Sequence, residues 1–361
     1  MKINLVMIVK NEERSLKRCL EAVKPLVDRM IVVDTGSYDR TREIAEKMGA
    51  ELYSFTWIND FSAAKNFALD QSDGDWNLVL DADEYVRPYR RRNLEKALAG
   101  HRGIWLGGML WYNSYPEEDG GVSISTSVLP RLFPRGVRYT GRIHEQPDGE
   151  YPCYRIPLEV DHDGYLYTDK GERNLPYLLQ EAKDHPKDAY YQFQLASTLR
   201  NLKRLEESLP YFRSFYRLSG KGEAYRPGGI VLYLYTLLDI GNMQCLSEAG
   251  AVVEQEEAVL GGWSDFCFVC GLFYMKRVLS DVEKYIGLLP NIERCYKRCL
   301  ELGEHPELGG VVGTGSFKAA YNLGAWYEVS GQRELALRYY RQSAKDGYGP
   351  AMERLKQYQE E

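Results

Sequence analysis

The chain has 361 residues, of which 44% are hydrophobic and 27% are charged, and its formal net charge at pH 7 is −6. At roughly 100–200 residues per domain, this length predicts two or three domains with substantial cores. Acidic and basic residues are mixed along the chain, so the basic patch needed for binding a phosphate backbone is missing and no nucleic-acid partner is expected. The 7 cysteines are irregularly spaced and suggest no disulfide framework, which favours a reducing, cytoplasmic location.

The N-terminal run MKINLVMIV (1–9) is apolar but short, because Lys10, Asn11 and Glu12 cut it off. It therefore predicts a first strand rather than a signal peptide. No stretch of about 18 uncharged apolar residues occurs anywhere, so no transmembrane helix is expected.

Short apolar runs alternate with helical patterns up to about residue 165. The runs INLVMIV (3–9), MIVVDTG (30–36) and WNLVLDAD (76–83) are dense in Val, Ile and Leu without strict alternation. That composition is typical of parallel strands buried on both faces. Helical spacing occurs between and around these runs, in 12–27, 39–49 and 61–72. The order predicts an open, Rossmann-like α/β sheet in a first domain, residues 1–170.

Each of the three predicted strands is followed by polar residues. Ligands of open α/β sheets bind beyond the carboxyl ends of the strands, so these residues predict one shared pocket. The third strand ends in three carboxylates, which need a cation, a network of donors, or open water. The polar residues at the three strand ends are Lys10, Asn11 and Glu12; Asp34, Thr35, Gly36 and Ser37; and Asp81, Asp83 and Glu84.

Residues 171–361 predict an all-α second domain that partly repeats. The segments 191–215 and 318–344 both fit the tetratricopeptide template, a helix–turn–helix with small and large residues at fixed places. Segments 263–278 and 292–303 fit a third, irregular copy with a long inner turn. Such repeats stack into a solenoid whose concave face binds partners, so this domain is expected to hold an acceptor or to mediate self-association as a homodimer. The aligned pairs are Leu195 with Leu323, Ala196 with Gly324, Leu199 with Tyr327, Ser208 with Ala336, and Phe212 with Tyr340.

Four cysteines of the helical half have spacings that resemble a zinc site. Cys267 and Cys270 are separated by two residues, and Cys295 and Cys299 by three. Both pairs lie in helical patterns, where cysteine serves as a small apolar residue. We favour this core interpretation, with zinc as the alternative.

The ordered motifs of the first half resemble the family 2 glycosyltransferases, inverting enzymes of the GT-A fold that use nucleotide-diphosphate sugars. The downstream motifs resemble a subgroup in which a tetratricopeptide-like half follows the catalytic half. That subgroup includes bacterial peptide S-glycosyltransferases that modify bacteriocin precursors, and cell-envelope oligosaccharide glycosyltransferases. The motifs that carry the resemblance are MIVKNEE (7–13), IVVDTGSYDRT (31–41), FTWINDFSAAKNFAL (55–69), WNLVLDADEYV (76–86), RLFPR (131–135), GRIHEQ (141–146) and VDHDGY (160–165).

The resemblance implies a metal site at the third strand end. Asp81-Ala82-Asp83 would be the DxD element, with Asp83 as a direct ligand of Mn²⁺ or Mg²⁺ and Asp81 addressing the ribose or sugar. His162 would complete the coordination of the ion. Hard oxygen ligands suit these cations, which also take phosphate and water as ligands.

The resemblance also implies a nucleotide site. Asp34 would accept a hydrogen bond from the base imide. Val9, Asn11 and Glu12 would form the rim that encloses uracil and ribose. Lys65 would approach the base or the phosphate.

Inverting transfer needs a base that takes the acceptor proton. In GRIHEQ the candidate is Glu145, with His144 as the second choice, while Arg131 and Arg142 stay without a defined role near the diphosphate or the acceptor. The implied function is metal-dependent transfer of a hexose or N-acetylhexosamine from a UDP-sugar, UDP-glucose or UDP-N-acetylglucosamine, to a Cys or Ser of a peptide or protein.

Two alternatives stay open. The acceptor would otherwise be a cell-envelope saccharide or lipid-linked molecule, with YRRRNLEKALAG (89–100) as a basic surface that holds the enzyme peripherally at the inner membrane face. Those arginines equally fit a solvated helix start. The third possibility is an inactive scaffold with tetratricopeptide-like repeats.

Overall fold

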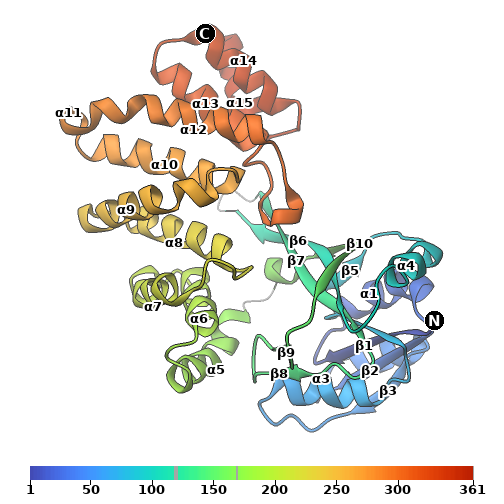
Figure 1. Cartoon of the computed structure of the whole chain (residues 1–361). Helices are drawn as coiled ribbons and strands as arrows, with labels where there is room; N and C mark the ends of the chain where they lie inside the picture. The colour runs from blue at the N-terminus through green and yellow to red at the C-terminus, as the bar shows by residue number, and fades with distance from the viewer. Residues whose placement is uncertain (118–120, 168–169, 361) are drawn as a thin grey trace. The chain divides into compact units, whose positions relative to one another are not determined.

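A computed structural model describes residues 1–117, 121–167 and 170–360 of the chain. The chain divides into two compact units, Met1–Lys170 and Gly171–Glu361. Each unit contains hydrophobic clusters made of its own residues. The first unit is α/β and the second is helical, as the labels of Figure 1 show, so the predicted fold class is confirmed.

A mixed sheet forms the centre of the first unit, with strand order β3-β2-β1-β4-β7-β6-β10-β5. The parallel pairs β1–β2, β2–β3 and β1–β4 confirm the predicted parallel core. The sheet is mixed rather than wholly parallel because β7 runs antiparallel to β4 and β6, and β5 runs antiparallel to β10. The strands are β1 (Ile3–Val9), β2 (Arg29–Asp34), β3 (Glu51–Ser54), β4 (Trp76–Val79), β5 (Glu84–Val86), β6 (Leu106–Pro116), β7 (Val122–Pro134) and β10 (Cys153–His162), with a separate pair β8 (Tyr139–Thr140) and β9 (Gln146–Pro147).

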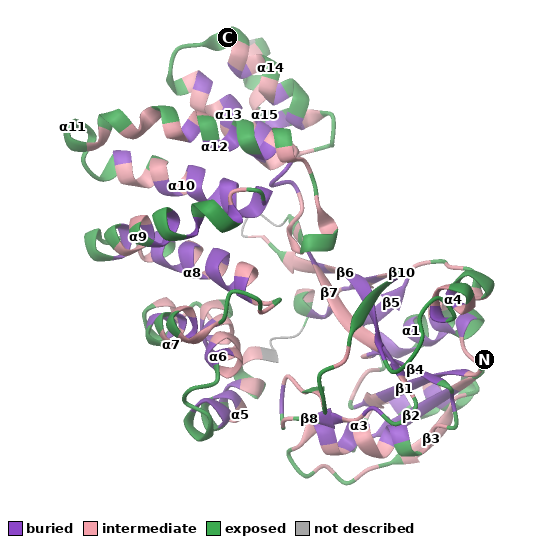
Figure 2. Ribbon diagram, in the orientation of Figure 1, coloured by how far each residue is buried: buried purple, intermediate pink, exposed green. Residues whose placement is uncertain are grey.

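Helices cover both faces of this sheet, which explains why the predicted strands lack polar alternation. In β1, Leu5 and Met7 belong to one hydrophobic cluster, whereas Val6 between them belongs to another. The first cluster includes residues of α1 and α4, and the second includes residues of α3. Figure 2 shows these strands as buried along their length. The helices are α1 (Leu16–Val23), α2 (Thr41–Lys47), α3 (Phe61–Asp70) and α4 (Arg91–Leu98), with 3₁₀ turns at Lys24–Leu26 and Gly164–Leu166.

From α6 to α15, neighbouring helices of the second unit pack on one another, with α10 packing directly on α12, so most of the unit is a stack of helix pairs (Figure 1). The helices of this unit are α5 (Lys170–Asp184), α6 (Ala189–Asn201), α7 (Leu205–Leu218), α8 (Arg226–Ile240), α9 (Met243–Leu260), α10 (Ser264–Ser280), α11 (Val282–Tyr285), α12 (Leu289–Leu302), α13 (Phe317–Val329), α14 (Arg333–Ala344) and α15 (Gly349–Glu360), with 3₁₀ turns at Ile286–Leu288 and Pro306–Leu308 and a short β11 (Gly310–Val311).

The predicted repeats correspond to α6–α7 and α13–α14. All five aligned residue pairs are buried in both copies. The small residue of the template is needed for close packing, because a Cβ at Gly324 would lie 2.8 Å from the ring of Tyr340. The irregular third copy is α10 with α12, and α11 lies in the long turn between them. No helix among the described residues has the length and apolar character required to cross a membrane.

Candidate functional site

The end of β10 lies beside the carboxylates that follow β4. His162 is the last residue of β10, and it pairs in register with Glu84 at the start of β5. Asp81 and Asp83 occupy the turn between β4 and β5. Sheet pairing therefore brings a histidine far along the chain to the acidic turn.

Asp83 and His162 face each other at this sheet edge. Both are buried, and His162 Nε2 lies 3.6 Å from Asp83 Oδ2. On the other side of the ring, His162 Nδ1 lies 2.9 Å from Asn113 Oδ1, and Asn113 Nδ2 donates to Ser127 Oγ at 3.2 Å. An amide oxygen only accepts, so this contact assigns a proton to His162 Nδ1 and leaves Nε2 facing Asp83. Metal-binding histidines are commonly oriented in this way.

Arg131 in β7 joins two of the acidic side chains. It donates to Glu84 Oε1 at 2.8 Å and lies 3.5 Å from Asp81 Oδ2. Glu84 also accepts a hydrogen bond from the backbone N–H of Asp81 at 2.9 Å. Burial raises the pKa of Glu84, although the charge of Arg131 opposes that rise. For Arg131, burial would lower the pKa, but Glu84 and Asp81 raise it above its usual value.

Helix α3 is attached to the segment that carries the predicted base. Asn66 Nδ2 donates to the carbonyl oxygen of Tyr139 at 2.9 Å, and Tyr139 N–H donates to Asn66 Oδ1 at 2.9 Å. Phe61 N–H donates to the carbonyl oxygen of Arg142 at 2.9 Å. These bonds place Glu145 beside α3.

Lys65 of α3 lies between the carboxylates of Glu145 and Asp81. Its ammonium pairs with Glu145 and lies 3.8 Å from Asp81 Oδ1, and its side chain is buried. Burial would lower the pKa of Lys65, but the two carboxylates raise it above its usual value. For Glu145, burial would raise the pKa, and the charge and hydrogen bond of Lys65 instead hold it below its usual range. Glu145 is therefore a carboxylate at neutral pH.

His144, the second candidate for the base, differs from its neighbour in its backbone and in its charge. Its φ is +50°, an uncommon value for a residue other than glycine. Burial lowers the pKa of His144, and the attraction of Glu145 opposes this only in part. A neutral imidazole is expected at pH 7.

Charge is not balanced in this group of side chains. Asp81, Asp83, Glu84 and Glu145 are four acidic side chains, whereas Lys65 and Arg131 are two permanent cations, so the acidic groups outnumber the cations by two. Partly buried charges of one sign repel strongly in a low-dielectric environment. The group, called the acidic cluster below, is suited to binding a doubly charged cation.

Asp34 lies in the loop that follows β2 and contacts that loop rather than the acidic cluster. Its carboxylate accepts from the N–H groups of Ser37 at 3.1 Å and Gly36 at 3.3 Å, and it pairs with Arg42 at 3.0 Å. Burial would raise the pKa of Asp34, but these donors lower it. Two carboxylate oxygens offer about four acceptor sites, and Gly36, Ser37 and Arg42 already donate to them.

Residues after β1 and β2 are tied together at the same edge of the sheet. Asn11 N–H donates to Ser37 Oγ at 2.9 Å, and Glu12 N–H donates to Thr41 Oγ1 at 2.6 Å. The buried Val9 accepts from Thr35 N–H at 2.9 Å. The predicted rim residues thus share a shelf at the carboxyl ends of two parallel strands. Ala82, the central residue of the DxD element, is buried between its two acidic neighbours.

Three further side chains at this edge were missed by the sequence analysis. Asn113 orients His162, as described above. Tyr165 contacts the His162 ring edge-on with centroids 4.7 Å apart, and Tyr115 stacks on Tyr165 at 4.6 Å. Asn113 and Tyr115 lie in a β-strand whose pairing had not been anticipated, so no motif marked them.

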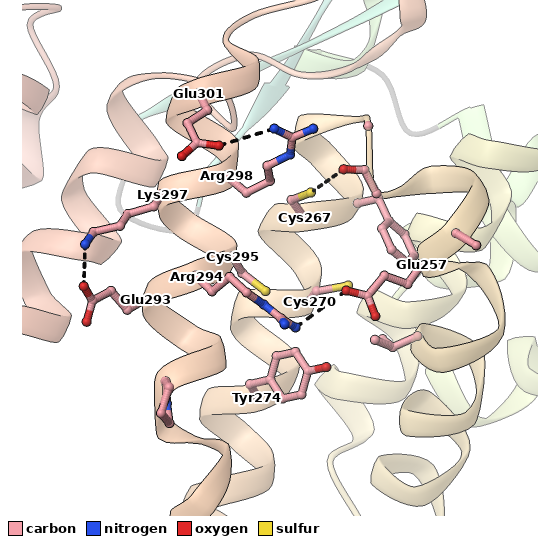
Figure 3. A pocket seen from close by; sticks show the side chains of 16 residues that line it. Glu257, Cys267, Cys270, Tyr274, Glu293, Arg294, Cys295, Lys297, Arg298 and Glu301 are labelled. Carbon is pink, nitrogen blue, oxygen red and sulfur yellow. Dashed lines mark hydrogen bonds and ion pairs between the residues drawn. The ribbon is translucent and has the colours of Figure 1, made fainter.

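Three cysteines of the helical unit, Cys267, Cys270 and Cys295, line a cavity between α9, α10 and α12, with a volume of about 760 Å³ (Figure 3). Burial raises the pKa of Cys267 to about 11 and that of Cys295 to about 12, so both stay neutral thiols. Cys267 donates to the carbonyl oxygen of Gly261, and Cys299 to that of Ser264. Within the described part of the chain, no group of three or more His, Cys, Asp or Glu side chains is placed to hold a metal ion. Cys267, Cys270, Cys295 and Cys299 are all buried among the helices.

Comparison with known families finds a match within the first unit. Residues 5–144 match the family model described as Glycosyl transferase family 2. The resemblance inferred from the motifs is therefore confirmed over this range. The range includes the ends of β1, β2 and β4, the proposed metal ligand Asp83 and, as its last residue, His144.

Curated relatives extend the similarity beyond that range. A TPR repeat-containing protein of Synechococcus elongatus is 34% identical over 215 residues, 55% of this chain and 52% of the relative. The SPbeta prophage-derived glycosyltransferase SunS of Bacillus subtilis is 27% identical over 218 residues, 57% of this chain and 51% of the relative. This chain therefore spans about half the length of the curated relatives that it matches.

Among solved structures, one similar protein is glucosyl-3-phosphoglycerate synthase from Mycobacterium tuberculosis, in complex with Mn²⁺, uridine diphosphate and glucosyl-3-phosphoglycerate. It is 25% identical, with a TM-score of 0.27, over 30% of this chain and 44% of that protein.

Proposed function

We propose that this chain is a metal-dependent inverting glycosyltransferase that transfers a hexose or N-acetylhexosamine from a UDP-sugar to a Cys or Ser side chain of a peptide or protein. The acidic cluster carries the proposal, because its excess of acidic side chains over cations lies at the carboxyl ends of parallel strands, where such sheets bind ligands. The family match of residues 5–144 supports the same chemistry.

Asp83 and His162 fit a divalent ion. The side chains of Asp83 and His162, whose Oδ2 and Nε2 atoms lie 3.6 Å apart, would hold the ion. Two protein ligands suit an ion that takes its other ligands from water and substrate phosphate rather than from a closed protein cage. When bound, Mn²⁺ or Mg²⁺ would neutralise the diphosphate and stabilise it as a leaving group.

The donor nucleotide fits the shelf formed by the loops after β1 and β2. Asp34 is proposed to accept from the base imide, with Val9, Asn11 and Glu12 around the uracil and ribose. The buried Lys65 is a cation at neutral pH and lies within reach of Asp81, so it is placed to meet phosphate charge.

Glu145 is the proposed base. During one displacement it takes the proton of the acceptor thiol or hydroxyl, the acceptor atom bonds to the anomeric carbon, and the bond from that carbon to the diphosphate breaks with the electron pair leaving on UDP. Lys65 holds Glu145 ionised and within one side chain of Asp81, so acceptor and donor chemistry lie close together. Neutral His144 is the second candidate for this role.

A carboxylate with a lowered pKa is a weak base, which favours a thiol acceptor. A cysteine thiol ionises near pH 8.5, far below the range of a serine hydroxyl, so it asks less of the base. The stacked helix pairs of the second unit offer the kind of surface that binds an extended peptide. UDP-glucose and UDP-N-acetylglucosamine are the proposed donors.

One of the three arginines that the membrane-linked alternative assigns to a lipid surface is already bound within the first unit. Arg91 donates to the carbonyl oxygen of Leu26 at 2.6 Å and to Asp28 Oδ2 at 2.9 Å, so it fastens α4 to the rest of the unit. Exposed Arg90 and Arg92 remain for a lipid headgroup. Sedimentation with anionic vesicles tests this alternative.

Calorimetry of UDP binding with and without Mn²⁺ tests the proposal. Wild-type protein is expected to bind UDP in the presence of Mn²⁺ and to lose most of that affinity after chelation. Asp83→Ala should weaken Mn²⁺-dependent binding by more than about 100-fold, beyond the 10–100-fold effect of outer-shell partners. Incubation with nucleotide sugars and cysteine or serine peptides, followed by mass spectrometry, then identifies the acceptor.

Asp161→Ala is the matched control, since Asp161 lies on β10 and pairs with Arg87 at 2.8 Å instead of contacting the acidic cluster. It should bind UDP like the wild type. UDP affinity that is unchanged by chelation would contradict the metal-dependent mechanism. Sugar transfer to saccharides alone, with no peptide adduct, would reassign the acceptor to the cell-envelope class.

A further inference from the structure

The segment that follows His162 folds directly onto the proposed metal ligands. A Cβ at Gly164 would lie 2.0 Å from Asp83 Oδ2 and 2.8 Å from His162 Nε2, so any larger residue there would displace these two side chains. Asp163 N–H donates to the carbonyl oxygen of Asp83 at 3.4 Å. A small displacement of this segment would therefore move His162 relative to Asp83.

Asp163 fixes the segment to the neighbouring elements. Its carboxylate accepts a hydrogen bond from Tyr85 Oη at 3.1 Å. It also forms ion pairs with Arg14 at 3.5 Å and with Arg18 of α1 at 3.4 Å. The Asp163 side chain is 18% exposed, while the Arg14 and Arg18 side chains are 45% and 61% exposed.

Aromatic contacts reinforce the same attachment. The guanidinium of Arg14 lies 3.8 Å from the ring centroid of Tyr167, and that of Arg18 lies 3.7 Å from the ring centroid of Tyr85. An exposed ion pair alone contributes little to stability, and a cation–π contact at an exposed site adds a contribution of similar size. Together these contacts can hold a short segment that a single surface pair would not.

We propose that Asp163 is a positioning residue that clasps the segment 162–167 to Arg14, Arg18 and Tyr85, and so holds His162 against Asp83. This inference rests on the proposed function, because the proposed divalent ion is what His162 would be positioned to bind. The clasp also connects two parts of the donor site: Arg14 lies two residues after the rim residue Glu12, while His162 faces Asp83 of the acidic cluster. Asp163 acts through His162 and contacts no substrate.

Asp163→Asn tests the clasp, since it keeps the size of the side chain and removes the charge that both arginines contact. Hydrogen exchange of the metal-free protein, read by mass spectrometry, should show faster exchange in 163–167, where Leu166 N–H donates to the carbonyl of Asp163 at 3.0 Å. Titration with Mn²⁺ in the presence of UDP should show affinity reduced about tenfold, the lower end of the range for outer-shell partners.

Asp161→Asn is the control, because it removes a carboxylate of the same strand that pairs with Arg87. It should change neither measurement, and circular dichroism of both variants should match the wild type. Unchanged exchange in Asp163→Asn, or faster exchange with unchanged Mn²⁺ affinity, would overturn the positioning role. If the wild type binds no Mn²⁺, the proposed function fails, while the exchange comparison still decides whether Asp163 clasps the segment.

Discussion

Both units bury ionic side chains, but they balance the charges differently. In the helical unit, Arg226 at the start of α8 forms a two-bond pair with Glu256 of α9, with N–O distances of 2.9 and 2.8 Å. Tyr216 Oη donates to the same carboxylate at 2.9 Å. Each charge meets an equal and opposite one, so this group needs no ligand.

The acidic cluster of the first unit has the opposite character. Its carboxylates outnumber its permanent cations by two, although several of its members are as buried as Arg226 and Glu256. Buried ionic groups persist when they are paired, and an excess of one sign is costly unless a counterion is bound. The comparison teaches that charge balance, rather than burial, separates a structural ion pair from a candidate ligand site.

The largest effect is expected for a variant of Glu145, the proposed base in the acidic cluster. Glu145→Gln keeps the shape of the side chain but cannot take a proton, so kcat for transfer should fall by about 10²–10⁴-fold while Mn²⁺-dependent UDP binding is retained. The acceptor determines how the loss responds to pH. With a thiol acceptor, the rate of the variant should recover as the pH rises through about 8.5, because the thiol then ionises by itself.

Glu150→Gln serves as the control for this variant, since Glu150 is an exposed acid of the same segment. It should leave kcat unchanged. A Glu145→Gln enzyme with wild-type kcat would pass the role of base to His144.

The sequence predicted the parallel part of the sheet because it rests on local patterns. Continuous apolar runs such as 3–9 and 76–79 identify strands buried on both faces, and the structure has strands there. The β6–β7 ribbon was not predicted, since its buried and half-buried residues follow no simple period. Antiparallel pairing across a long hairpin depends on partners rather than on composition.

The residues of the candidate site also fall into those that the sequence predicted and those that it did not. Asp81, Asp83 and His162 carry motifs, so sequence alone selected them, and strand pairing then brought them together. Asn113 carries no motif, and its contact with His162 depends on strand register. Likewise, nothing in the sequence indicated that Lys65 would pair with Glu145, because hydrogen bonds from α3 to the 139–142 segment create that contact.

Removing one partner of the balanced pair tests the structural side of the comparison. Arg226→Met leaves Glu256 buried without its guanidinium and should lower the free energy of unfolding by about 3–5 kcal/mol. The double variant Arg226→Met, Glu256→Leu should recover most of that loss, because replacing a buried pair by apolar residues is often neutral. Urea unfolding followed by circular dichroism measures both. UDP binding that falls in parallel would show that the pair also serves the ligand site.

Asp265 provides the smallest test, because it is a buried acid held mainly by uncharged donors. Burial raises the pKa of Asp265 to about 7, and the nearby carboxylate of Glu304 adds to this rise. Two hydrogen bonds oppose it: one from the N–H of Val311, which donates to Oδ2 at 2.8 Å, and one from the side chain of Thr314.

The folded state thus binds a proton that the unfolded state releases near pH 4, so stability is greatest below that pH and falls as the pH rises to about 7. The slope should approach about 1.4 kcal/mol per pH unit within this window and disappear in Asp265→Asn. Urea unfolding of both proteins at pH 5, 6 and 7 measures it, on the order of 2 kcal/mol in total. If wild type and variant show the same dependence of stability on pH, Asp265 is ionised in the folded state. A buried acid can then persist in this protein without a bound counterion. That result would also weaken the charge-balance argument for the acidic cluster.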